Sequence, residues 1–529
     1  MPRSLVFILF CASLLFCSQL PTELVYDDIL LIGKNQTLAQ PSLSKIFTQH
    51  LWEGTPNFDG TNGSYYRPLM ILSLVIDRVF FGENIAFYHL HSIFWHLLCC
   101  TLLWFWLAKY ISRQKILFAS VFCFAIHPAN VEIVAFLAAR NDSMACVGIL
   151  AMLLAIKNNR SMGIFLALIF ALLSKESALL IPPAYIFLHC FKEKQLPKKN
   201  ILLPILAAFS CYFSLRFFAD IPWPTRPSSS ITDLGIGFLI YLDHAFFPDV
   251  LLPGSHVLWP TTKEIIGGCL GFVALLFLLY KSPYRILGGV LFIAGLIPAF
   301  SAIGSTGLAA DRYLYLPMMG LLLLIASSCE QYKTSRMTTP ISIVVILYMA
   351  IHSFRILPSW SNNIQLFADA VSASPSPFRA GAYAKALEEK GDLDLAADWY
   401  EHAVQPPNPN PHSCYNITWI HFLRQDFARI ITAGEKALAA GCEPSAELAA
   451  PLSLAHALNG NWERARMLSN HHSRDPRNIF SIVRTALKAR DRDENYFQNS
   501  QQSPLQDALK LLDANDPQSA AWLRERVQP

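Results

Sequence analysis

Long apolar segments follow one another through the first two-thirds of this chain, separated by short polar connections. A membrane-spanning helix needs about 20 mainly apolar residues, and only a helix or closed barrel satisfies its backbone there. We therefore expect an all-α, polytopic membrane domain over residues 1–357, with about eleven transmembrane helices. The expected spans are residues 4–20, 87–108, 115–130, 141–156, 161–174, 176–191, 201–218, 264–280, 284–303, 308–328 and 340–357.

The composition agrees with a membrane protein. Hydrophobic residues make up 53% of the 529 residues and charged residues 15%, whereas soluble domains carry about 25% charged residues. The net charge of +4, without a basic stripe, does not indicate nucleic-acid binding. Ten of the 12 cysteines lie in or beside apolar segments, and Cys414 and Cys442 in the tail could form a disulfide.

Four segments of the membrane domain differ from ordinary spans. The run after Arg3 offers no good cleavage site, which favours an uncleaved anchor over a signal peptide. Residues 21–67 are polar and form a long first outer loop. Residues 68–81 are apolar but short, so we expect a helix lying at the membrane surface. The stretch 231–247 contains acids and His244, and we place it at the surface too.

Charge in the connections predicts the orientation of the chain. Lys and Arg are enriched in cytoplasmic loops, which places the N-terminus in the cytoplasm and the C-terminal tail in the periplasm or the lumen of the endoplasmic reticulum. The basic loops carry Arg113, Lys115, Lys157, Arg160, Lys192, Lys194, Lys198, Lys199, Lys281, Arg285, Lys333 and Arg336. The opposite loops carry Asp27, Asp28, Glu132, Asp142, Asp220 and Asp311.

A soluble tail follows a Pro- and Ser-rich linker at residues 358–377. Turn-like positions at Gly391, Gln425 and Gly460 recur at intervals of 34 and 35 residues, the period of tetratricopeptide (TPR) helix pairs. We expect residues 378–529 to form a TPR-like helical domain, with an irregular helical bundle as the alternative. Such arrays bind peptides or partner proteins.

Ionisable residues near the outer membrane surface are functional candidates, because charges at membrane depth are expensive. Asp27 and Asp28 follow the first helix, where a carboxylate could act as a general base; ordinary loop acids or a helix cap are the alternative. Glu132 and Arg140 are eight residues apart and would share one face of a helix, with Asp142 close by. An arginine there could bind a phosphate, or form an internal salt bridge with these acids.

Further cations occur between other spans. Lys175, followed by Glu176, has no loop around it and could contact a phosphate or extend to the interface. Arg312 and Tyr313 begin another span, where an aromatic belt is the alternative explanation. Arg67 lies at the end of the first outer loop. Acids and cations on one side of one membrane suit a reaction whose leaving group is a phosphate.

The order of these motifs resembles that of the transmembrane-and-TPR O-mannosyltransferases, members of the GT-C glycosyltransferase superfamily, and of bacterial membrane proteins with the same layout. The resemblance runs from about residue 24 to the repeats. Its motifs are Tyr26-Asp27-Asp28, Tyr66-Arg67-Pro68-Leu69, the pattern HPxxVExVAxxxxRxD from His127 to Asp142, Ser174-Lys175-Glu176-Ser177 and Asp311-Arg312-Tyr313-Leu314-Tyr315-Leu316-Pro317.

The resemblance implies an inverting transfer of a sugar, such as mannose, from a polyprenyl- or dolichyl-phosphate carrier to a protein Ser or Thr hydroxyl. It implies that Asp27, with Asp28 beside it, is the catalytic base, and that Arg140, Lys175 and Arg312 contact the donor phosphate. The remaining candidates for substrate binding are Arg67, His127, Glu132, Asp142, Glu176 and Tyr313. The sequence demands no metal, although the acid pairs could hold a divalent cation.

Two other classes of function fit the same residues. A flippase or transporter for lipid-linked sugars would also hold phosphate with arginines, but it requires cations and access in both leaflets. A membrane scaffold would work through its tail alone, and neither Asp27 nor Arg140 would then matter. The tail has about three repeats, fewer than the long arrays of the eukaryotic proteins, and this difference leaves the acceptor open.

Overall fold

A computed structural model provides the fold, and almost all of its described elements are helices. The chain divides by its contacts into Met1–Asp369 and Ala370–Pro529, a boundary inside the linker that the sequence predicts. The predicted end of the tail, 471–529, and part of the first outer loop lie outside the described residues. The structure describes residues 1–56, 65–223, 230–248, 255–256, 260–306, 308–331, 338–406, 409–424 and 426–470.

The first unit is a helical bundle with the properties of a polytopic membrane domain. Within the described residues, seven helices are long and apolar enough to cross a membrane, or eight if the bent pair of α6 and η2–α7 counts as one span. The apolar α1 (Arg3–Cys17) and α9 (Ser161–Ser174) are shorter, so the number of about eleven spans stays a prediction. The seven are α5 (Ile85–Leu107), η3–α8 (Leu137–Lys157), α11 (Lys199–Phe218), α13 (Thr262–Lys281), α14 (Arg285–Thr306), η5–α15 (Asp311–Gln331) and α16–η6 (Thr338–Ser361).

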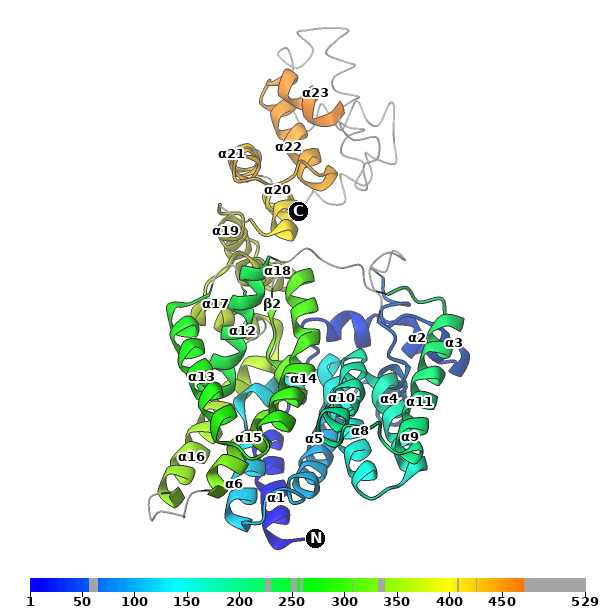
Figure 1. The fold of residues 1–529 in the computed structure, drawn as a ribbon. Helices are drawn as coiled ribbons and strands as arrows, with labels where there is room; N and C mark the ends of the chain where they lie inside the picture. The colour runs from blue at the N-terminus through cyan, green and yellow to red at the C-terminus, as the bar shows by residue number, and fades with distance from the viewer. Residues whose placement is uncertain are drawn as a thin grey trace. The chain divides into compact units, whose positions relative to one another are not determined.

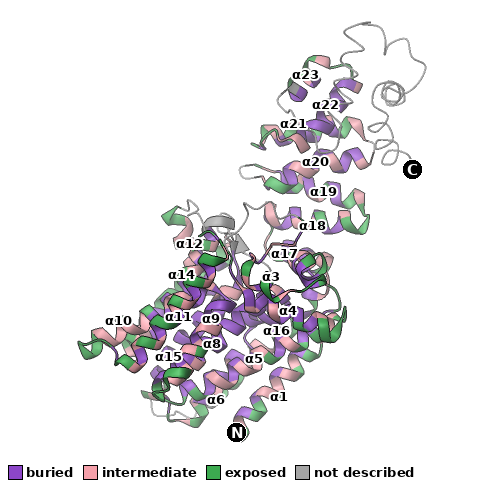
Figure 2. Ribbon diagram, turned by 90° about the vertical axis from the view of Figure 1, so that its right-hand side faces the viewer, coloured by how far each residue is buried: buried purple, intermediate pink, exposed green. Residues whose placement is uncertain are grey.

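Burial separates the interior helices from those that would face lipid. The buried share is 89% in the apolar window of Leu137–Lys157 and 78% in that of Asp311–Gln331, against 17% in that of Pro340–Ser361. In Figure 2 the ribbon of α8, in the middle of the view, is largely purple, the colour of buried residues. Lipid tails are as apolar as the side chains of α13 and α16. These side chains can therefore face lipid without a hydrophobic penalty.

Short helices interrupt the long ones at the positions of the predicted motifs. α6 (Gln114–Ala125) ends before His127-Pro128, and η2 (Pro128–Asn130), α7 (Val131–Ala135) and η3 (Leu137–Ala139) follow. The imidazole of His127 accepts a hydrogen bond from the backbone N–H of Ala129, which caps this turn. η4 (Glu176–Leu180) similarly separates α9 from α10 (Ile181–Glu193), and η5 (Asp311–Leu314) precedes α15. Irregular backbone at membrane depth is tolerated where it is buried in protein or lines a cavity.

The first outer loop packs on the predicted surface helix. It contains η1 (Ile29–Gly33), α2 (Gln36–Ala39) and α3 (Leu43–Thr48), and it shares an apolar core with α4 (Pro68–Phe81). α4 exposes Val79 and Phe80 on its other side, as expected for a helix at a membrane surface. Figure 1 shows α2 and α3 at the end of this bundle opposite the N-terminus.

Three antiparallel helix pairs form the described part of the tail. The first helices of the pairs begin at Pro377, Pro411 and Ala446, 34 and 35 residues apart. In each pair, a side chain in the turn accepts a hydrogen bond from the backbone three residues later and caps the second helix; the caps are Asp392, Asp426 and Asn461. Their identity as TPR units stays a prediction. The pairs are α18 (Pro377–Lys390) with α19 (Leu393–Ala403), α20 (Pro411–Leu423) with α21 (Phe427–Ala439), and α22 (Ala446–Leu458) with α23 (Trp462–Asn470).

A disulfide joins Cys414 on α20 to Cys442 after α21, with 5.7 Å between their Cα atoms. The bond connects the two helices of the second pair, as the sequence allowed but did not require. Two short strands, β1 (Ser255–His256) and β2 (Leu308–Ala309), pair antiparallel before η5 and are the only strands within the described ranges.

Candidate functional site

The two acids after the first helix have different surroundings. Both oxygens of Asp28 accept backbone hydrogen bonds, from the N–H groups of Leu137 and Ala138 at 3.0 and 2.7 Å. Burial raises the pKa of Asp28 to about 8, and these two donors oppose the rise. Asp28 thus joins the first outer loop to η3, which is a structural role.

Asp27 is partly exposed, and its side chain makes no hydrogen bond or ion pair with any residue that the structure describes. Burial raises the pKa of the Asp27 carboxyl, while the nearby positive charge of Arg312 lowers it. A carboxylate that has no partner and lies near a cation can accept a proton from an incoming hydroxyl. Asp27 therefore fits the predicted base better than Asp28 does.

Arg312 pairs with Glu132 across 180 residues of sequence. Its guanidinium donates to one oxygen of Glu132, and its backbone N–H donates to the other at 3.0 Å. The guanidinium also lies near the ring of Tyr313, 5.3 Å from the centroid. Glu132 is buried, whereas the Arg312 side chain retains 21% exposure, so the acid holds in place an arginine that is still partly accessible.

Lys175 occupies the break between α9 and η4. Its ammonium donates to both oxygens of Asp142, at 2.6 and 2.5 Å, and lies 4.8 Å from the centroid of the Tyr313 ring. Burial lowers the pKa of Lys175 to about 8, although the charge of Asp142 favours the protonated form. The ring of Tyr313 thus has Lys175 and Arg312 close to it.

Arg67 and Glu176 form the third pair. The Nε of Arg67 donates to Glu176 at 2.8 Å, and the backbone N–H of Tyr66 donates to the other oxygen of Glu176 at 2.7 Å. The guanidinium lies 4.5 Å from the centroid of the Tyr65 ring. This pair connects the end of the first outer loop to η4.

These three pairs form one group of charges with Asp27, which we call the charge cluster. Lys175 lies within electrostatic range of Arg67 and Arg312. An acid on one side of each cation fixes its position, and such preorganised charges can stabilise an anion that develops during a reaction. The cluster comprises Asp27, Arg67, Glu132, Asp142, Lys175, Glu176 and Arg312, gathered around Tyr313.

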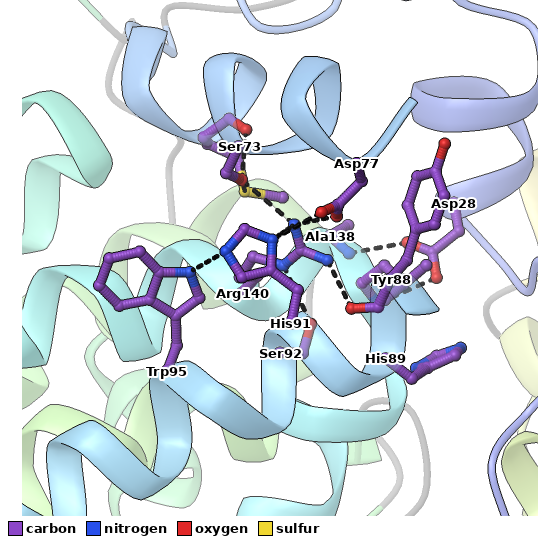
Figure 3. A network of polar contacts seen from close by, with 12 residues as sticks. Asp28, Ser73, Asp77, Tyr88, His89, His91, Ser92, Trp95, Ala138 and Arg140 are labelled. Carbon is purple, nitrogen blue, oxygen red and sulfur yellow. Dashed lines mark hydrogen bonds and ion pairs between the residues drawn. The ribbon is translucent and has the colours of Figure 1, made fainter. Parts of the chain in front are cut away.

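Arg140 belongs to a different network (Figure 3). Its guanidinium is fully buried and donates to Asp77 at 2.5 Å, to the hydroxyl of Ser92 at 3.0 Å and to the backbone carbonyl of Tyr88 at 2.7 Å. His91 contacts the second oxygen of Asp77 at 2.6 Å. These contacts join α4, α5 and α8. The role of Arg140 as a phosphate contact stays a prediction, and the geometry favours an internal ion pair.

Glu132 and Arg140 would share one helical face if the segment between them were a single helix, and it is not. α7 ends at Ala135, and η3 turns the chain before α8 begins at Arg140. The chain is not one helix there, so residues eight apart do not align. His127 is buried as the cap of η2, and its second ring nitrogen lies 3.4 Å from the backbone carbonyl of Ala245.

The structure adds a histidine that was not among the predicted site residues. His244 on α12 (Ile231–Phe246) lies 2.5 Å from Asp311 and 3.6 Å from Glu264, and all three are buried. The two carboxylates raise the pKa of His244 to about 10, against the effect of burial. His244 stands in an apolar run, a signal that was visible in the sequence. No group of three or more His, Cys, Asp or Glu side chains among the described residues could hold a metal ion.

The chain is thus an all-α polytopic membrane protein that holds a cluster of paired charges. The relatives that it matches are named protein O-mannosyl-transferases. It is 35% identical over 182 residues to Protein O-mannosyl-transferase Tmtc1 of Drosophila melanogaster, which covers 32% of this chain and 20% of the relative. It is 22% identical over 410 residues to Protein O-mannosyl-transferase F38B6.6 of Caenorhabditis elegans, covering 71% and 58%.

Human Protein O-mannosyl-transferase TMTC1 is 30% identical over 143 residues, which cover 26% of this chain and 16% of the relative. The chain therefore matches less than two-thirds of the length of each of these relatives. No family model matches the chain, and no solved structure matches it significantly.

Proposed function

We propose that this chain is an inverting glycosyltransferase that moves a sugar from a polyprenyl-phosphate carrier to a Ser or Thr hydroxyl of a protein. The names of the relatives support a protein O-mannosyltransferase and make mannose the first sugar to test. The observation that carries the proposal is the combination of Asp27, which has no partner among the described side chains, with the positive charge of Arg312 near it.

The charge cluster provides the parts that such a transfer needs. The donor phosphate would be held by Arg312 and Lys175, with Arg67 beside them; Glu132, Asp142 and Glu176 keep these cations in place. Aromatic rings beside Lys175, Arg312 and Arg67 provide flat surfaces on which a sugar could stack.

In the proposed reaction, the acceptor hydroxyl gives its proton to Asp27 as its oxygen attacks the anomeric carbon. The bond between that carbon and the phosphate oxygen breaks, and the phosphate leaves with the electron pair. Attack from the face opposite the phosphate inverts the anomeric configuration. The negative charge that grows on the phosphate is stabilised by the cations, and a single contact of this kind contributes on the order of 3 kcal/mol to the barrier.

We also propose that the charge cluster and the tail face the periplasm or the lumen of the endoplasmic reticulum. The distribution of Lys and Arg among the connecting loops supports this orientation. The tail could then present a protein acceptor to the membrane domain, as helical-repeat domains bind peptides.

The test is release of polyprenyl phosphate from polyprenyl-phosphate mannose by the purified protein, with a mixed pool of protein and peptide acceptors. We expect Asp27→Asn to lower turnover by about 10²- to 10⁴-fold, the usual contribution of a general base, without loss of folded protein. Glu23→Gln, which changes an exposed acid four residues earlier, is the matched control and should have no effect.

Equal turnover by the wild type and Asp27→Asn would show that Asp27 is not the base. If the wild type releases no polyprenyl phosphate but moves a labelled donor between leaflets, the protein is a flippase and the proposal is wrong.

A further inference from the structure

The hydroxyl of Tyr241 has no hydrogen-bond partner among the residues that the structure describes, although the residue is fully buried. Six tyrosines of the described chain are among its largest fully buried side chains, and the other five have a partner for the hydroxyl. Those partners are the carbonyl of Phe47 for Tyr66, the carbonyl of Gly82 for Tyr88, Arg216 for Tyr212, His96 for Tyr315 and Glu388 for Tyr400.

A buried hydroxyl without a hydrogen-bond partner lowers the stability of the folded protein. Phenylalanine fills the same space without a polar atom, so a tyrosine with no role beyond packing gains nothing from its oxygen. Buried polar groups in folded proteins are nearly always paired, and an exception calls for an explanation such as a ligand.

Tyr241 lies beside the charge cluster. It precedes His244 by three residues on α12, which places the two side chains on the same face of that helix. His244 contacts Asp311 at 2.5 Å, and the next residue of η5 is Arg312. Glu132 and Arg312 lie within electrostatic range of the Tyr241 hydroxyl. α12 packs against η5, so Tyr241 lies near the segment that carries Arg312.

The neighbouring acids are already engaged. Glu132 holds Arg312, and Asp311 holds His244. A hydroxyl donor near a cation, with these two carboxylates occupied, suits an incoming anion. The Arg312 side chain is partly exposed, whereas the Tyr241 hydroxyl is buried. Binding of an anion at Arg312 would therefore have to make the hydroxyl accessible as well.

We infer that the Tyr241 hydroxyl donates a hydrogen bond to a phosphate oxygen of the lipid-linked donor, next to Arg312. This inference rests on the proposed function and extends it to a residue on α12, outside the predicted motifs. Tyr241 is then a binding residue whose hydroxyl is unpaired until the donor arrives.

The experiment compares Tyr241→Phe with Tyr88→Phe, using polyprenyl phosphate as the probe. Both substitutions remove one buried hydroxyl, but that of Tyr88 donates to the carbonyl of Gly82 at 2.7 Å. Thermal unfolding in detergent and the Kd for polyprenyl phosphate are measured for both variants and the wild type, together with kcat/KM for the sugar donor.

We expect Tyr241→Phe to keep or raise the Tm, because it removes an unpaired polar group. Its affinity for polyprenyl phosphate should fall by roughly ten- to a hundredfold, the loss expected for a hydrogen bond to a charged group. Tyr88→Phe should lower the Tm and leave the affinity unchanged. This opposite pattern would not arise from general damage to the fold.

Two results would overturn the inference. If Tyr241→Phe binds polyprenyl phosphate and turns over donor like the wild type, the hydroxyl has no part in binding, while the proposed function stands. If Tyr241→Phe lowers the Tm as Tyr88→Phe does, the hydroxyl has a structural partner. Failure of the wild type itself to bind polyprenyl phosphate or to use the donor would instead remove the proposed function, and the inference with it.

Discussion

Asp27 and Asp28 are adjacent in the chain, yet their surroundings differ. Asp28 is held by two backbone N–H groups, whereas the Asp27 side chain makes no hydrogen bond or ion pair with the residues that the structure describes and lies near the charge of Arg312. Neighbouring acids in a loop cannot be told apart from sequence alone, because the N–H donors of Asp28 come from η3, more than a hundred residues later.

The pH dependence of turnover tests the environment of Asp27. Burial raises the pKa of its carboxyl and Arg312 lowers it. A base must be deprotonated to act, so activity should be lost as the pH falls through this raised pKa, above the ordinary value for Asp of about 3.9. Arg312→Gln removes the cation that favours the carboxylate, so we expect the acidic limb of the kcat/KM profile to move to higher pH.

Arg312→Lys is the control, since it keeps the positive charge; its acidic limb should stay close to that of the wild type even if turnover falls. If the limb does not move in Arg312→Gln, either Asp27 is not the group that titrates or Arg312 does not act on it.

At the scale of elements, the buried ion pair of Arg140 and Asp77 connects α8 to α4. Removing one partner of a buried ion pair leaves an uncompensated charge, which costs about 3–5 kcal/mol. We therefore expect Asp77→Asn to lower the free energy of unfolding by roughly this amount, measured by denaturant or thermal unfolding in detergent. The double variant Asp77→Leu with Arg140→Met, which removes both charges, should recover much of the loss.

A direct role of Arg140 in donor binding would give a different result. The double variant would then be stable but unable to bind polyprenyl phosphate. Stability and binding measured on the same samples therefore decide between the internal ion pair and the predicted phosphate contact.

The second helix pair of the tail carries its own constraint. The bond between Cys414 and Cys442 closes a loop across 28 positions of sequence, and a disulfide around a loop of this size stabilises by about 3.5 kcal/mol in the chain-entropy account. We expect Cys414→Ala with Cys442→Ala to lower the stability of the tail by about that amount, seen as faster proteolysis of the tail in the full chain. Cys17→Ala with Cys329→Ala, which removes two exposed free thiols, should not change it.

At the scale of the whole molecule, the sequence predicted the class of fold but not the pairing of its charges. Apolar length and loop charge suffice to predict a polytopic α-helical domain, and the 34-residue interval predicted the spacing of the tail helices. The partners of Glu132 and Lys175 come from other helices. Local periodicity contains no information on such contacts, so the sequence offered several partners for each charge and could not choose among them.

The orientation of the molecule in its membrane follows from the same loop charges, and it can be measured directly. If the basic loops are cytoplasmic, the exposed Cys329 near the end of α15 is on the cytoplasmic side, and the tail is on the opposite side. In sealed vesicles whose cytoplasmic face is outside, a membrane-impermeant maleimide should label Cys329, and protease should leave the tail intact until the membrane is opened.

The control is Cys329→Ala, which should lose the labelling while keeping protection of the tail. The tail disulfide gives an independent readout, because such bonds persist in the periplasm or the endoplasmic reticulum and are reduced in the cytosol. The opposite orientation would be indicated if protease cleaved the tail in sealed vesicles and if Cys414 and Cys442 were reduced in protein taken directly from cells. The charge cluster would then face the cytoplasm, because both its predicted side and that of the tail depend on the basic loops being cytoplasmic.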